Sequence, residues 1–222
     1  MSSRDLVLKS IKQAVKIPSH LPELPDGTDN AITAGLAAIT PGSPDELRDQ
    51  FAKELGAVSG EFVRVSDKHE LSKRLLQDME KHSYKSIVFP NADSCADLVQ
   101  NLSGMECLIA DSMEEAIRRE RLARTQCACV TVDHAVADTA SLAVILSSGN
   151  SLFPHYLPDT IYVVLQPHQL LANIFELFDK VPPEQAKNML LITGPSRTAD
   201  IEKILILGAH GPRRLVVYWI QP

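Results

Sequence analysis

The stretch FVRVSDKHELSKRLLQDMEKHSYKSIVF, residues 62–89, contains two short apolar runs separated by a helical pattern. The flanking runs FVRV and SIVF are apolar and β-branched, which favours strands, whereas residues 67–82 have the periodicity of a helix. Continuously apolar strands that alternate with helices are typical of a parallel sheet that is covered on both faces. We therefore predict a strand–helix–strand unit here.

The same alternation continues along the rest of the chain. The fold class that it predicts is α/β, with a largely parallel sheet covered by helices on both faces. The pair of closely spaced strands around 128–147 and the last strand are the candidates for antiparallel additions. The further strands are expected at 107–110, 128–132, 141–147, 160–166, 188–193 and 214–220, and further helices at 93–102, 112–123 and 168–179.

A domain boundary is predicted at residue 43. Ser43 is a candidate N-cap, followed by a proline at the first helical position and by Glu46, which completes a capping box. Residues 1–42 contain an amphipathic helical pattern at 4–17 and then many prolines and glycines, which predicts an extended arm. The helix of this arm must pack either on the main domain, residues 43–222, or on a partner subunit. In the second case, residues 1–42 would connect the subunits of a homo-oligomer.

Composition excludes several classes of protein. The net charge of −6 argues against a general binder of nucleic acid or anionic membranes, because neutralising phosphates needs a basic surface. The four cysteines lack the spacing of a metal or iron–sulfur ligand set, which favours buried thiols in a reducing compartment. No signal peptide or membrane-spanning run is recognisable, so we expect a cytoplasmic protein with no metal and no cofactor evident in this chain.

Polar side chains follow the apolar run at 188–193, in the segment GPSRTADIE. Because ligands of open α/β sheets bind outside the carboxyl ends of the strands, this segment is a candidate anion site. Backbone N–H groups of a following helical turn would form a cradle, and Arg197 would bind a carboxylate or phosphate bidentately. Alternatively, the segment is only a helix start with Thr198 as N-cap. The candidate ligand-binding residues of the C-terminal segment are Gly194, Ser196, Arg197, Thr198, Glu202 and Gly211.

Two other positions carry chemistry. His210, beside Gly211, could move a proton near neutral pH, as could Asp200, so both are catalytic candidates. Asp138 and Thr139 lie between two expected core strands and could contact a ligand. The alternative for each of these residues is a structural role in a turn.

The segments GPSRTADIE (194–202) and LGAHGPRRLVVYWI (207–220) resemble the C-terminal signature of the LUD-domain family, the LutC-like lactate-utilisation proteins. VTVDHAVADTASLAVIL (130–146) resembles the family's second block, although Ala140 stands where many members have glycine. The resemblance implies a fold similar to that of the NagB/RpiA/CoA-transferase-like proteins. It also implies a role beside iron–sulfur and cysteine-rich subunits that together oxidise L-lactate to pyruvate.

Three hypotheses about function stay open at this point. The chain could be a component of a lactate-oxidising system that binds a small carboxylate or other anion at 194–202. It could instead be a free-standing enzyme of the CoA-transferase-like group acting on a phosphorylated, CoA-linked or folate-type substrate. The third hypothesis is a non-catalytic assembly module, so whether the chain is an enzyme by itself is left undecided.

Overall fold

The computed structural model describes residues 42–93, 98, 101–145, 151–182, 185, 188–199, 205–207 and 211–221. For residues 197–199 and 205–207 we describe the backbone alone. The predicted arm, residues 1–42, lies outside the described residues apart from Gly42, so that its helix and its role in assembly stay predictions. Residues from Pro41 onward form one compact unit.

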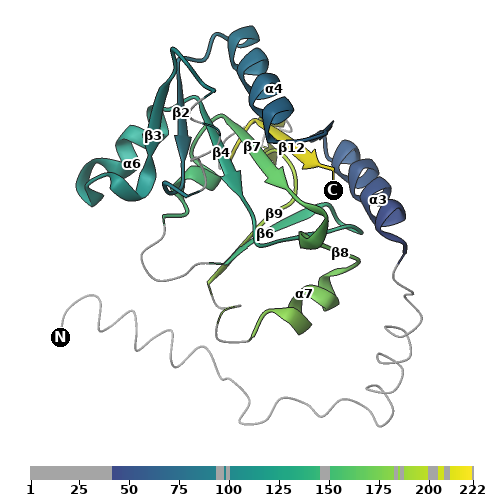
Figure 1. Ribbon diagram of the computed structural model, residues 1–222. Coiled ribbons are helices and arrows are strands. Elements are labelled where there is room, and N and C mark those ends of the chain that lie inside the picture. Colours follow the sequence, from purple (N-terminus) through teal and green to yellow (C-terminus); the bar gives the residue numbers. More distant parts are fainter. Residues whose placement is uncertain are drawn as a thin grey trace, which may run out of the picture. The chain divides into compact units, whose positions relative to one another are not determined.

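The centre of this unit is a six-stranded sheet in the order β1-β12-β7-β4-β2-β3, in which every neighbouring pair is parallel. The predicted α/β fold with a largely parallel sheet is confirmed (Figure 1). The prediction that the last strand could be antiparallel is wrong, because β12 runs parallel between β1 and β7. The strands are β1 Glu61–Val65, β2 Ser86–Phe89, β3 Glu106–Ile109, β4 Cys127–Thr131, β7 Thr160–Leu165 and β12 Arg214–Ile220.

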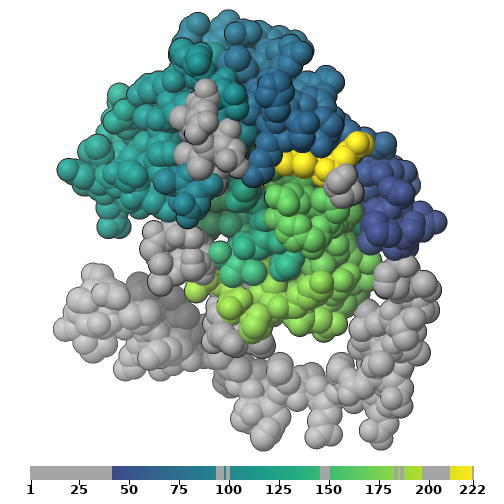
Figure 2. Space-filling model, viewed as in Figure 1, coloured from purple at the N-terminus to yellow at the C-terminus, as the bar shows by residue number. Residues whose placement is uncertain are grey.

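Helices cover both faces of this sheet. On one face, α4 (Lys68–Lys81) packs Leu71, Leu75 and Met79 against β2, β4, β7 and β12. On the other face lie α3 (Pro44–Ala57) and α6 (Glu115–Arg124), which contribute buried side chains to a second core cluster. The space-filling view shows α3, in purple, beside the yellow C-terminal strand (Figure 2).

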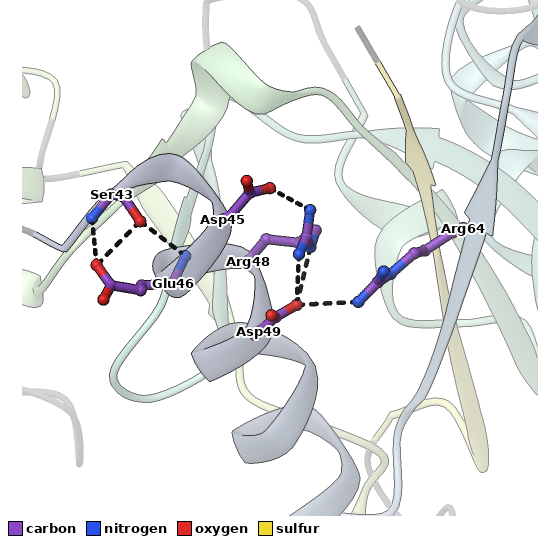
Figure 3. Close-up of polar contacts among 6 residues, drawn as sticks. All are labelled: Ser43, Asp45, Glu46, Arg48, Asp49 and Arg64. Carbon is purple, nitrogen blue, oxygen red and sulfur yellow. Dashed lines mark hydrogen bonds and ion pairs between the residues drawn. The ribbon is translucent and has the colours of Figure 1, made fainter.

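The start of α3 matches the predicted capping box. The Ser43 side chain accepts a hydrogen bond from the Glu46 amide, and the Glu46 carboxylate accepts one from the Ser43 amide at 2.7 Å (Figure 3). Pro44 occupies the first helical position, where its missing N–H costs nothing. These local interactions explain why the helix begins where the sequence predicted.

A second sheet packs on the α3 and α6 side of the large sheet. Its order is β8-β5-β6-β9, with β5–β6 and β6–β9 antiparallel and β5–β8 parallel. Its strands share the core cluster of that face, and α7 (Ile174–Lys180) covers the opposite side of this small sheet (Figure 1). The strands are β5 His134–Val136, β6 Ser141–Ile145, β8 Leu170–Leu171 and β9 Met189–Ile192.

Several predicted elements differ from the observed ones. The helix expected at 168–179 starts only at Ile174, because Asn173 caps it and Leu170–Leu171 pairs with β5. Short 3₁₀ turns occur at Ala110–Ser112 (η1), Phe153–His155 (η2) and Pro167–Gln169 (η3). Most of the helix expected at 93–102 lies outside the described residues. Across the described part of the chain, no helix is long and apolar enough to cross a membrane.

Candidate functional site

The signature loop begins at Gly194, directly after β9, and this glycine has a packing role. Its φ is +92°, a conformation that L side chains rarely adopt. A Cβ at this position would lie 2.7 Å from Cγ2 of Val58, the residue that caps α3. The close approach of backbone to Val58 therefore requires glycine here.

The two halves of the C-terminal signature meet at Ser196. Its amide donates a hydrogen bond to the carbonyl of Pro212 at 2.8 Å. Gly211 has a φ of +150°, and a Cβ there would be 3.3 Å from Cβ of Ser196. Because the Ser196 amide is already paired, it does not contribute to the expected cradle of backbone N–H groups.

A helix start at Thr198 is wrong, because residues 197–199 form a strand, whereas residues 200–203 of the expected helical turn lie outside the described residues. Arg197–Ala199 forms strand β10, which pairs antiparallel with β11, Leu205–Leu207. The apolar run that follows the acidic residues supplies the second strand, so that backbone pairing across the hairpin replaces a helix start at Thr198. The side chains of Arg197 and Thr198, and the whole of Asp200, Glu202 and His210, lie outside what the structure describes, so their predicted roles stay predictions.

The second block forms the hairpin between β5 and β6, and it meets the signature loop. The Thr139 hydroxyl donates to the Ser141 hydroxyl at 2.9 Å, and Ser141 Oγ lies 2.7 Å from Thr193 Oγ1. Pairing of β6 with β9 extends the same contact along both strands. Asp138 and Thr139 lie at the turn, and the Asp138 amide donates to the Ala172 carbonyl. The structure thus brings the Thr139 turn together with Thr193 and the start of the signature loop, which lie far from it in the sequence.

This cluster lies at the amino ends of the parallel strands, and not at their carboxyl ends as the sequence pattern predicted. Pro212, which accepts from Ser196, precedes β12, and Val58, which touches Gly194, precedes β1. The reason is that β9 belongs to the second sheet and is antiparallel to β6. The carboxyl-end rule applies to strands of the parallel sheet, and β9 is not one of them.

Ala140 lies at the turn of this hairpin, in a backbone conformation that favours glycine. Its φ is +51° and it is fully buried. A left-handed conformation costs an alanine roughly 1 kcal/mol relative to glycine. The chain therefore keeps a glycine-type turn with a side chain in place.

We predict that Ala140→Gly changes the free energy of unfolding by less than about 0.5 kcal/mol, because relief of the backbone offsets the lost methyl contacts. Ala143→Gly is the matched control, since Ala143 is also fully buried but lies within β6. It should cost about 1 kcal/mol more than Ala140→Gly. Urea denaturation measures both, and equal losses would contradict the strain at Ala140.

The carboxyl edge of the parallel sheet has a crevice of about 420 Å³. It lies beyond the ends of β2 and β4, since Pro90 and Asn91 follow β2, and Thr131 is the last residue of β4. From β2 the chain continues outward to β3, whereas from β4 it continues to β7 in the opposite direction along the sheet. This is the topological switch point of the sheet, where open α/β proteins bind ligands.

The described residues that line the crevice include one carboxylate, that of Asp133, and one buried imidazole, that of His155. The Asp133 carboxylate accepts a hydrogen bond from the Ile145 amide at 2.7 Å, which fixes its orientation. His155, at the end of η2, is 5% exposed, and its Nε2 lies 3.4 Å from the Thr131 carbonyl oxygen. Burial lowers the pKa of His155, and the carbonyls of Thr131 and Leu152 only partly offset this effect.

The crevice was not among the sites predicted from the sequence. The sequence does contain a pattern that indicates this site. Polar segments follow residues 86–89 and 128–132, and the two apolar runs that precede them form strands of the parallel sheet. Applying the carboxyl-end rule to these two strands would have found Asn91, Thr131 and Asp133. Among the residues whose side chains are described, no group of three His, Cys, Asp or Glu residues could hold a metal ion.

The fold and these two sites define an α/β protein with an open parallel sheet, a second sheet on one face, and a crevice at the switch point. The chain belongs to the LUD domain family, whose model matches residues 48–220. The match includes the large sheet, both signature blocks and the crevice. The resemblance inferred from the sequence is confirmed.

Two relatives carry the same name. Lactate utilization protein C of Oceanobacillus iheyensis is 26% identical over 183 residues, which are 77% of this chain and 78% of that protein. Lactate utilization protein C of Macrococcus caseolyticus is 23% identical over 204 residues, covering 89% and 86% of the two chains. Among solved structures, a DUF162 family protein from Deinococcus radiodurans superposes with a TM-score of 0.62 at 18% identity, covering 82% of this chain and all of that one. The superposition supports the fold.

Proposed function

We propose that this protein is a LutC-like component of a system that oxidises L-lactate to pyruvate. The observation that carries the proposal is the similarity, over more than three quarters of the chain, to two relatives named lactate utilization protein C. The matched part is also 78% and 86% of those two relatives, so the similarity extends over most of each protein. In this proposal the two electrons removed from lactate leave through iron–sulfur and cysteine-rich partner subunits.

The ligand in this proposal is a small carboxylate held by Arg197. A guanidinium group binds a carboxylate through two parallel hydrogen bonds, which gives both affinity and orientation. Arg197 directly follows Ser196, whose amide is held by Pro212, so that the start of β10 has a fixed backbone. The hydroxyl pair Ser141–Thr193 anchors the same loop from the second sheet. The proposed recognition therefore uses the Arg197 side chain and does not use the Ser196 amide.

Isothermal titration of the full chain with L-lactate and with pyruvate tests the site. We expect Arg197→Ala to weaken binding by about 10- to 100-fold, which is the usual effect of losing hydrogen bonds to a charged group. Arg64→Ala is the matched control, because Arg64 is a half-exposed arginine whose partner is Asp49 near the start of α3. Binding of L-lactate that persists undiminished in Arg197→Ala would contradict the carboxylate site. Failure to co-elute with a purified iron–sulfur subunit would contradict the proposed assembly.

A further inference from the structure

The crevice at the switch point is a second candidate site, separate from the signature loop. The signature loop lies beside the amino ends of β1 and β12, whereas the crevice lies beyond the carboxyl ends of β2 and β4. A smaller hollow of about 190 Å³ adjoins it, since Thr131 lines both. The carboxyl edge of the sheet is therefore concave on both sides of β4.

The lining of the crevice indicates which kind of ligand it would take. Five lining side chains are apolar, and the other six can form hydrogen bonds. Neither lysine nor arginine occurs among these lining residues, and Asp133 supplies a negative charge. Among the described residues that line the crevice, no cation would balance this charge for a bound carboxylate or phosphate, which is unfavourable. The polar lining residues are Asn91, Thr131, Asp133, Ser151, His155 and Gln185.

The buried histidine does not supply the missing positive charge. Because burial lowers its pKa, the His155 ring is mostly uncharged at neutral pH. Its Nδ1 has no hydrogen-bond partner among the described residues, and its Nε2 is directed to the Thr131 carbonyl. The charged groups that act on the ring are Asp133 and Asp111, both acidic. Asp111 accepts a hydrogen bond from the Ser151 amide at 3.2 Å, which ties the wall at Ser151 to η1.

Hydroxyl and amide groups on the walls both donate and accept hydrogen bonds, and the Asp133 carboxylate accepts them. A ligand that satisfies this set must donate at Asp133 and both donate and accept elsewhere, as hydroxyl groups do. We propose that the crevice binds an uncharged ligand with several hydroxyl groups, of the sugar or ribosyl class. Its hydroxyls pair with Asp133, Thr131, Ser151 and Gln185, and its carbon skeleton packs on Val132, Val144 and Leu152.

The test uses the full chain labelled with ¹⁵N and titrated with D-ribose, adenosine and L-lactate up to about 10 mM, a range that detects millimolar binding. D-ribose alone and the ribosyl group of adenosine are separate arms, so that a free sugar and a nucleoside are distinguished. We expect the amide signals of residues 131–133, 144–145 and 151–155 to shift with at least one of these two probes and not with L-lactate. Shifts there with L-lactate only, or with none of the three probes, would overturn the proposal.

The replacement Asp133→Asn is expected to weaken or to strengthen binding according to the charge of the ligand. The change removes the charge and keeps an oxygen that can accept from the Ile145 amide, so that the fold should be retained. We expect about tenfold weaker binding of the hydroxyl ligand, because a hydrogen bond to a charged acceptor is lost. Stronger binding of the probe in this variant would overturn the proposal, since an anion would gain from the lost charge. Asp159→Asn is the matched control, because Asp159 is exposed and lies at the amino end of β7.

Discussion

Replacement of Arg214 by alanine is expected to lower the free energy of unfolding by about 3 kcal/mol. Arg214 begins β12 and joins it to β1 and to α4. Its Nε and Nη2 donate to the Glu61 carboxylate at 2.5 and 2.8 Å, and its Nη1 and Nη2 donate to the Asp78 carboxylate. The Tyr162 hydroxyl also donates to Asp78, at 2.6 Å. The side chains of Arg214 and Asp78 are only 20% and 17% exposed, so that removing the arginine leaves a carboxylate largely shielded from water.

Arg64→Ala is the control for this prediction. Arg64 also lies on a strand of the parallel sheet, β1. It forms an ion pair with Asp49 at 2.9 Å, but both side chains are about half exposed (Figure 3). Exposed ion pairs contribute about 0.5 kcal/mol, because water and salt screen the charges. Chemical denaturation in urea measures both variants. Equal losses in the free energy of unfolding would show that the network around Asp78 stabilises the fold no more than a surface ion pair does.

The pH dependence of stability gives an independent measurement of the same network. Burial alone would raise the pKa of Asp78, but hydrogen bonds from Arg214 and Tyr162 outweigh it and hold the pKa below its ordinary value. The contribution of Asp78 is therefore complete above the pKa of an unfolded aspartate, about 4, and is lost as the pH falls through the lower value in the folded protein. Arg214→Ala should therefore lower the free energy of unfolding and also weaken its dependence on pH in the acid range.

Elements that depend on local sequence were predictable. The Ser43 capping box, the helix at 67–82 and the apolar strands follow from side-chain periodicity and from interactions within one turn. The neighbours of each strand were not predictable in this way. RLVVYWI and NMLLIT look alike as apolar runs, yet β12 enters the parallel sheet and β9 pairs with β6 in the second sheet. Strand neighbours depend on packing between distant segments, which periodicity does not encode.

The same limit explains the outcome at the candidate sites. The sequence left open which polar segments meet in space, and the structure shows that the two signature blocks do, because Ser141 contacts Thr193 and Ser196 contacts Pro212. Their location at the amino ends was missed, because it follows from the sheet to which β9 belongs. The crevice was missed for the related reason that its walls come from separate segments, which only the sheet order brings together. The chemical character of each candidate residue could be inferred from the sequence. Its position in the fold depends on the order of the strands in the two sheets, which could not be inferred in this way.

Gly194→Ala is expected to lower the free energy of unfolding by about 3 kcal/mol, combining roughly 1 kcal/mol for the left-handed backbone with steric overlap. The new Cβ would lie 2.7 Å from Cγ2 and 3.0 Å from Cβ of Val58, and 3.3 Å from its carbonyl oxygen. The backbone carbonyl cannot rotate away, so that β9 or the end of α3 must shift. Thermal and urea denaturation measure the loss, and L-lactate affinity per folded molecule should stay within about twofold if the glycine serves packing only.

Gly104→Ala separates the two causes, because Gly104 has a similar φ of +84° but no atom within 4 Å of the position that a Cβ would occupy. It should cost about 1 kcal/mol, which is the backbone part alone. Val58→Ala in the Gly194→Ala background removes the closest clash, so the two changes together should cost about 1 kcal/mol less than the sum of their separate effects. Strict additivity would mean that the γ-methyl groups of Val58 are not what excludes a side chain at residue 194. In that case the cost would come from the left-handed backbone and from the contacts with Cβ and the carbonyl oxygen of residue 58, which Val58→Ala retains.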